Sequence, residues 1–147
     1  MKVMNRLLHL ATASIVALMA SYAFGKEPTD DQRDVARLHA RIEAPLASRN
    51  QKAYCEAFYG TEDYRRFRTR DCETGIKLGR RKPEECTSKA VDERVADEHK
   101  KCMAQGSAEF EATIDRHKEG RSGFVRRIAG QGIDGEKLIA EERAKLR

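Results

Sequence analysis

The sequence predicts an all-α protein, a small bundle of short helices with an antiparallel helical hairpin stapled by two disulfides. Apolar residues recur at spacings of three and four, and no segment alternates apolar and polar residues as a half-buried strand does. Four cysteines fall within residues 55–102. The chain has 147 residues, room for one domain at most, which excludes a multi-domain enzyme, a large parallel α/β sheet and a polytopic membrane protein.

Residues 1–25 have the pattern of a cleaved signal peptide. Two basic residues precede an apolar run at 7–20, and small residues follow at Ala23 and Gly25. The alternative is an uncleaved membrane anchor, but its 18 residues are at the short limit for a span and no basic flank follows them. We therefore expect a periplasmic or secreted protein without a stable membrane anchor after cleavage.

Residues 26–147 have too few large apolar side chains for a thick core. They hold 27 basic and 24 acidic residues, a net charge of +3, and only 23 apolar side chains other than Ala and Cys. Burying that number of side chains barely offsets the entropy lost on ordering the backbone, so we expect covalent cross-links to contribute. The low net charge and the predicted export also argue against nucleic acid as a partner.

The cross-links expected are disulfides between Cys55, Cys72, Cys86 and Cys102. An even number of cysteines in a small exported chain is typical of disulfides. Metal binding is the alternative, but no two cysteines have C-x-x-C spacing, and the nearest mixed pair, His99 with Cys102, has no neighbours to complete a tetrahedral site. We expect no metal and no cofactor.

Helix geometry favours one disulfide pairing. An unbroken helix over residues 84–105 would hold Cys86 and Cys102 about 24 Å apart, too far to bond to each other. The nested pairing, Cys55–Cys102 with Cys72–Cys86, fits two antiparallel segments and is preferred. The pairing Cys55–Cys86 with Cys72–Cys102 remains the alternative.

Local signals divide the rest of the chain into helices. Pro45 is expected to kink or end the first helix, and Gly120 and Gly123 to interrupt the one that follows residue 107. A bend is expected at residues 60–61, because the two cysteines of the 84–105 helix point about 160° apart. The main loop is expected at 73–85. The expected N-caps are Asp30 or Asp31, Asn50, Thr61, Ser107 and Asp134.

The C-terminal residues are expected to be less firmly held than the rest. We predict a disulfide-stabilised helical domain over residues 26–129 and a glycine-rich connector with a loosely held helix over 130–147. Three glycines fall within residues 130–135, and the last helix offers only Leu138, Ile139 and Leu146 to a core.

Basic residues between 65 and 82 form the predicted binding patch. Guanidinium groups interleaved with aromatic rings suit phosphates, anionic glycans and acidic protein surfaces. The alternative is a solvated helix face whose charge is offset by nearby acids such as Asp63 and Asp71. The candidate binding residues are Arg65, Arg66, Arg68, Arg70, Arg80, Arg81 and Lys82.

The sequence contains no catalytic motif. A nucleophile elbow, a P-loop and a dinucleotide-binding glycine pattern are all missing, and His39, His99 and His117 lie far apart in the sequence. We predict that the protein is not an enzyme but an interaction or inhibitor protein, whose partner is another envelope or extracellular protein or an anionic glycan. The alternatives are a periplasmic stress protein or chaperone that responds to pH, and a small hydrolase acting on envelope glycans.

Overall fold

A computed structural model describes residues 25–147, so the predicted signal peptide lies outside the described residues apart from Gly25. The described part is all-α, as predicted, and has no strand. None of its helices is both long enough and apolar enough to cross a membrane. The elements are α2 (Asp30–Ala47), α3 (Gln51–Tyr59), α4 (Glu62–Lys77), the 3-10 turn η1 (Pro83–Cys86), α5 (Ser88–Met103), α6 (Ser107–Ala129) and α7 (Gly135–Ala144).

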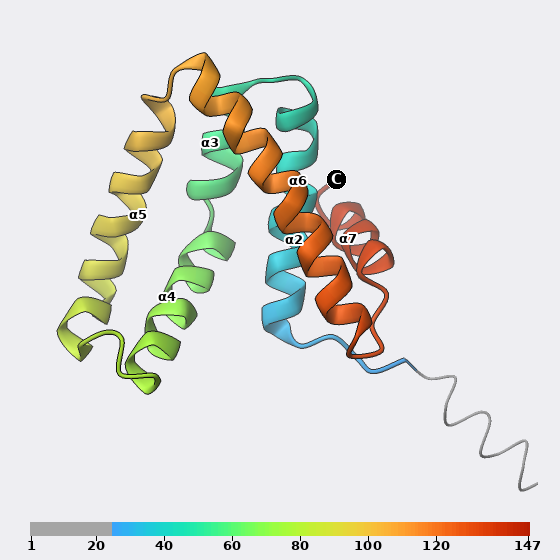
Figure 1. The fold of residues 1–147 in the computed structure, drawn as a ribbon, viewed down its shortest axis with the longest axis horizontal. Helices are drawn as coiled ribbons and strands as arrows, with labels where there is room; N and C mark the ends of the chain where they lie inside the picture. Colours follow the sequence, from blue (N-terminus) through green and yellow to red (C-terminus); the bar gives the residue numbers. More distant parts are fainter. Residues whose placement is uncertain (1–24) are drawn as a thin grey trace, which may run out of the picture.

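One arm of the predicted helical hairpin is made by α3 followed by α4, and the other arm is α5, along whose side they lie (Figure 1). Cys55 of α3 bonds to Cys102 near the end of α5, with Cα atoms 5.8 Å apart. Cys72 of α4 bonds to Cys86 of η1, with Cα atoms 5.6 Å apart. This is the nested pairing preferred from the sequence, and it fixes both ends of the hairpin.

The segment expected to be one helix over 84–105 is broken at Thr87. Thr87 has extended backbone angles, and its hydroxyl accepts a hydrogen bond from the Ala90 N–H, which caps α5. Cys86 therefore lies on η1 and not on α5, so the two cysteines do not share a helix axis. The bend between α3 and α4 lies where it was expected, because Thr61 is extended and caps α4.

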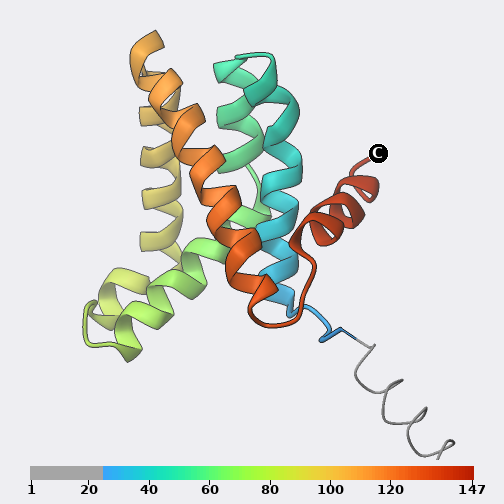
Figure 2. The same cartoon turned by 45° about the vertical axis from the view of Figure 1, so that its right-hand side comes forward.

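Helix α2 runs through the centre of the bundle and contributes to two apolar clusters, which α6 joins by crossing it diagonally (Figure 2). In the first cluster, Ala36 and Ala40 of α2 pack with the C-terminal half of α6 and with α7. In the second, Ile42 of α2 packs with Tyr54 of α3 and with the N-terminal half of α6. The region between the two clusters is where α6 passes over α2.

Two local expectations about the helices were wrong, and a third was close. α6 continues through Gly120 and Gly123, because Phe124 and Ile128 beyond them are buried and hold the helix on the core. Pro45 lies in the last turn of α2, which ends at Ala47, and proline has no N–H to donate to the carbonyl four residues earlier, so the helix ends close to where it was expected to. The expected loop at 73–85 is shorter, because α4 continues to Lys77.

The N-caps follow the expectations at three of five positions. Asn50, Thr61 and Asp134 accept hydrogen bonds from the first turns of α3, α4 and α7. Thr29, not Asp30 or Asp31, caps α2 and forms a capping box with Gln32. Gly106 precedes α6, so Ser107 is the first residue of the helix instead of its cap.

The C-terminal helix is packed firmly, which corrects the expectation of a loosely held one. Leu138 and Ile139 are buried against α2 and α6, and Glu142 is fully buried as well. Gly135 lies so close to Val125 that a Cβ there would be 3.0 Å from the Val125 Cα. The glycines of the connector thus allow α7 to fold back closely onto α6 and do not leave it loose.

Candidate functional site

The arginines of the predicted patch that lie on α4 bind acids of the protein itself. Arg66 and Arg70 reach Asp34 of α2, with N–O distances of 3.1 and 2.9 Å. Arg68 donates to Glu98 of α5 at 2.8 Å, and Arg65 pairs with Asp92 of the same helix. These four guanidinium groups therefore connect α4 to α2 and α5.

Three carboxylates on this side of the bundle are buried: Asp34, Asp63 and Glu142. Each forms ion pairs with arginine side chains. Arg37 of α2 contacts all three, at 3.2, 2.9 and 2.7 Å. Burial alone would raise the pKa of Asp34, but hydrogen bonds from Arg66 and Arg70 and the charges of both arginines lower this pKa below its ordinary value. Through their ion pairs the three carboxylates join α2, α4 and α7.

The basic residues of the loop between α4 and η1 form fewer ion pairs than the arginines of α4 do. Arg81 is half-buried against Gly75 and lies 3.9 Å from Asp71. Arg80 and Lys82 are exposed, and neither side chain forms an ion pair with any residue of 25–147. Leu78, at the start of the loop, is 58% exposed. We call residues 78–82 the hairpin tip.

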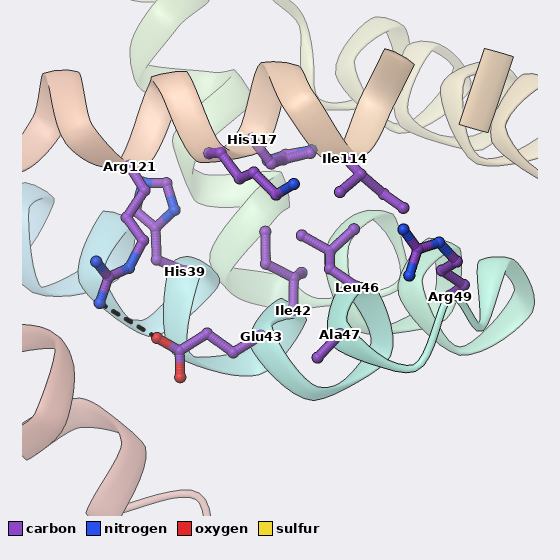
Figure 3. Close-up of a pocket in the computed structure, with 10 residues that line it drawn as sticks. His39, Ile42, Glu43, Leu46, Ala47, Arg49, Ile114, His117 and Arg121 are labelled. Carbon is purple, nitrogen blue, oxygen red and sulfur yellow. Dashed lines mark hydrogen bonds and ion pairs between the residues drawn. The ribbon is translucent and has the colours of Figure 1, made fainter. Parts of the chain in front are cut away.

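A groove opens between α2 and α6, at the place where α6 passes from one apolar cluster to the other (Figure 3). Its volume is about 280 Å³. Ile42 and Leu46 of α2 and Ile114 of α6 provide its apolar surface, and the aliphatic side chains face one another across it in Figure 3. The remaining lining residues are His39, Glu43, Ala47, Arg49, His117, Lys118 and Arg121.

The two histidines of the groove are largely buried and uncharged near neutral pH. Burial lowers the pKa of His39 to about 4, and the charges of His117 and Arg121 add to the effect. Burial lowers the pKa of His117 to about 4 in the same way, with a further contribution from Arg116. His117 is hydrogen-bonded through Nε2 to the Tyr54 hydroxyl, whereas His39 forms no hydrogen bond within residues 25–147.

The charges around the groove are unevenly balanced. Arg121 lies 2.6 Å from Glu136 and 3.4 Å from Glu43, but Glu43 also pairs with Arg143, so these two acids serve two arginines. Arg49 has one partner, Glu111, at 2.7 Å, and both side chains are more than half exposed. Among the residues that line the groove, Arg49, Lys118 and Arg121 are cationic against one acid, Glu43, so the lining is net cationic.

Sequence reasoning did not single out this groove, although its pattern was present. His39, Ile42 and Leu46 recur at spacings of three and four on α2, and Ile114, His117 and Arg121 do so on α6. A histidine within an apolar stripe was the available signal. That the two stripes face each other follows only from the way α6 crosses α2.

The site has no counterpart to compare it with, since the chain matches no protein-family model, no curated protein and no solved structure. Within residues 25–147, no three side chains of His, Cys, Asp or Glu are grouped so that they would hold a metal ion. What the structure defines is the class of protein: a disulfide-bonded α-helical domain with an exposed basic hairpin tip and an apolar groove.

Proposed function

We propose that the protein is an exported binding protein of the cell envelope that contacts its partner through the hairpin tip. The observation that carries the proposal is the exposure of Leu78 next to Arg80 and Lys82, two cations without ion pairs in the described chain. An exposed apolar side chain beside unpaired cations is a suitable anchor for an acidic protein surface.

The position of the tip supports this proposal. It lies at one extremity of the molecule in both views, away from α2 and α7 (Figures 1 and 2). The Cys72–Cys86 disulfide closes the base of the loop, so less conformational entropy is lost when the tip binds. Gly79 adopts the left-handed conformation, φ 67°, that the tight turn after α4 requires.

The proposal that the protein is exported is supported by the cysteines and by the signal-peptide pattern. Both cysteine pairs form disulfides and residues 25–147 contain no free cysteine, which is typical of proteins in oxidising compartments. Together with the signal-peptide pattern of residues 1–25, this supports a periplasmic or secreted location.

The partner that fits the tip best is a protein with an acidic surface and a small apolar pocket for Leu78. An anionic glycan would bind Arg80 and Lys82 but would leave Leu78 exposed to water. The four arginines of α4 contribute less to partner binding, because their guanidinium groups are already paired with acids of the chain. Of the binding patch predicted from the sequence, we therefore propose that only the loop residues contact the partner.

The test is capture of an envelope protein by the oxidised protein and by a triple variant, Leu78→Ser, Arg80→Ser and Lys82→Ser. A matched control replaces Met103, Lys100 and Lys101 by Ser, which removes an exposed apolar residue and two exposed cations elsewhere. We expect the control to capture the same protein as the wild type and the tip variant to lose it. Equal capture by both variants, with unchanged circular dichroism, would exclude the hairpin tip as the contact surface.

A second candidate function is the pH-responsive stress protein. The specific observation in its favour is the pair of buried, uncharged histidines, His39 and His117, beside the junction of the two apolar clusters. Protonation of either ring would place a charge in an apolar region and favour opening there. Acid-induced binding of a hydrophobic dye would support this candidate, and no dye binding down to about pH 3 would count against it.

A further inference from the structure

We propose that the groove between α2 and α6 binds the carboxylate of a single-chain fatty acid, with the apolar chain along Ile42, Leu46 and Ile114 and the carboxylate at Arg49. This ligand site is separate from the hairpin tip, and its test does not depend on the proposed function.

The size of the groove selects the ligand. A volume of about 280 Å³ is just below the usual range of ligand pockets, about 300–1,000 Å³. The groove thus has room for one chain of medium length and not for a two-chain lipid. The apolar side chains that face it come from two helices, so a linear chain would contact α2 on one side and α6 on the other (Figure 3).

The charges of the groove select a single anionic group at one end. Arg121 has Glu136 as its partner and shares Glu43 with Arg143, whereas Arg49 and Lys118 each have one exposed acidic partner, Glu111 and Asp115. Such exposed ion pairs contribute little to stability, so a ligand carboxylate could replace either partner at small cost. At the other end, burial lowers the pKa of His39 to about 4, so its ring adds no positive charge near neutral pH.

Arg49 also has an unusual backbone conformation. It follows the C-cap Ser48 of α2 with φ 52°, a left-handed position that glycine and asparagine occupy most readily. In Figure 3 its side chain lies at the Leu46 end of the groove, opposite the end formed by His39 and Arg121. The Arg49 and Asn50 N–H groups donate to the Leu46 and Pro45 carbonyls, so this conformation ends α2 in a Schellman motif.

This conformation makes a clean test possible. Arg49→Asn removes the charge and places at φ 52° a residue that tolerates it, so the variant is expected to fold at least as well as the wild type. Arg49→Lys keeps the charge and serves as its control. Ala47→Phe fills the groove from an exposed position, and Ala96→Phe, on an exposed position of α5, is the matched control.

The probes are decanoate, 1-decanol and decylamine below their micelle concentrations, titrated calorimetrically into the oxidised protein at pH 7. We expect decanoate to bind with one site per chain and the neutral and cationic probes to bind at least about 10-fold more weakly, since a charge-assisted hydrogen bond is lost. Arg49→Asn is expected to weaken the binding of decanoate about 5- to 10-fold. The affinity for decanol should not change. Arg49→Lys should retain most of the affinity.

The groove variants complete the test. Ala47→Phe should abolish decanoate binding, and Ala96→Phe should leave it unchanged. The proposal is overturned if wild-type protein does not bind decanoate, if decanol or decylamine binds equally well, or if Ala47→Phe has no effect. It is also overturned if the groove is occupied by a second copy of the chain, seen as a dimer that Ala47→Phe dissociates in sedimentation.

Discussion

Arg37 of α2 and Glu142 of α7 form an ion pair in the interior, with Nε and Nη2 of the guanidinium 2.8 and 2.7 Å from one carboxylate oxygen. Glu142 is fully buried, and the second carboxylate oxygen accepts a hydrogen bond from Lys145. Because Arg37 also contacts Asp34 and Asp63, this one guanidinium connects the C-terminal helix to the rest of the bundle.

Glu142→Ala should therefore destabilise the protein strongly. The change removes the fully buried partner of Arg37 and Lys145, and loss of one member of a buried ion pair costs about 3–5 kcal/mol. Because Arg37 keeps Asp34 and Asp63, we expect a loss at the lower end of this range. The measurement is the free energy of unfolding in urea. The neighbouring Glu141, exposed and 4.0 Å from Lys137, is the control, and Glu141→Ala should change stability by less than about 0.5 kcal/mol. Equal losses for the two variants would contradict a structural role for the buried pair.

The protein should lose stability as the pH falls from about 6.5 to about 4. The pKa values of His39 and His117 are about 4 in the folded state and about 6.5 when exposed, so over this range the unfolded chain takes up protons that the folded chain does not. Each histidine contributes at most about 3 kcal/mol of this loss. Urea unfolding at pH 7.0 and 4.5 measures the effect.

Replacing both histidines identifies the source of this pH dependence. His39→Gln with His117→Gln should flatten the stability curve between pH 6.5 and 4. If the double variant keeps the full slope, the groove histidines are not responsible for it.

The two disulfides should differ in their contribution to stability. The Cys55–Cys102 bond closes a loop of 47 residues and the Cys72–Cys86 bond a loop of 14. In the chain-entropy model, loops of these lengths correspond to about 4 and about 3 kcal/mol. Double Cys→Ala variants of each pair, compared in urea, test this order, and the reverse order would contradict it. With both bonds reduced, we expect the helical circular-dichroism signal to be largely lost.

Two glycines should respond to alanine in opposite directions. Gly120 lies in the exposed middle of α6 with open space around it, so Gly120→Ala should stabilise the helix by about 0.5–1 kcal/mol. A Cβ at Gly135 would lie 3.0 Å from the Val125 Cα and 3.1 Å from Ile128 Cδ1, so Gly135→Ala should push α7 away from α6 and destabilise the protein. Thermal unfolding of the two variants gives the signs directly.

Features set by neighbouring residues were predictable from the sequence. The caps at Asn50, Thr61 and Asp134 each need only a side chain and the backbone three residues later. The nested cysteine pairing followed from helix length, and it was obtained even though the helix expected over 84–105 is in fact broken at Thr87.

Features set by packing between distant segments were not predictable. Gly120 and Gly123 were expected to stop α6, but burial of Phe124 and Ile128 on α2 and α7 overrides that local preference. The acids that bind Arg66 and Arg70 are likewise distant, since Asp34 lies more than 30 residues away in the sequence. The groove depends on the crossing of two helices that are separated by three others in the chain.

The nested order of the disulfides has a consequence for how the chain responds to proteases. The exposed Arg80 lies within the inner ring closed by Cys72–Cys86, and that ring lies within the outer one closed by Cys55–Cys102. A single cut after Arg80 therefore releases no fragment, and the two pieces stay covalently joined through two independent sulfur bridges. A nicked molecule has the same mobility as an intact one on a non-reducing gel and separates only when both bridges are reduced.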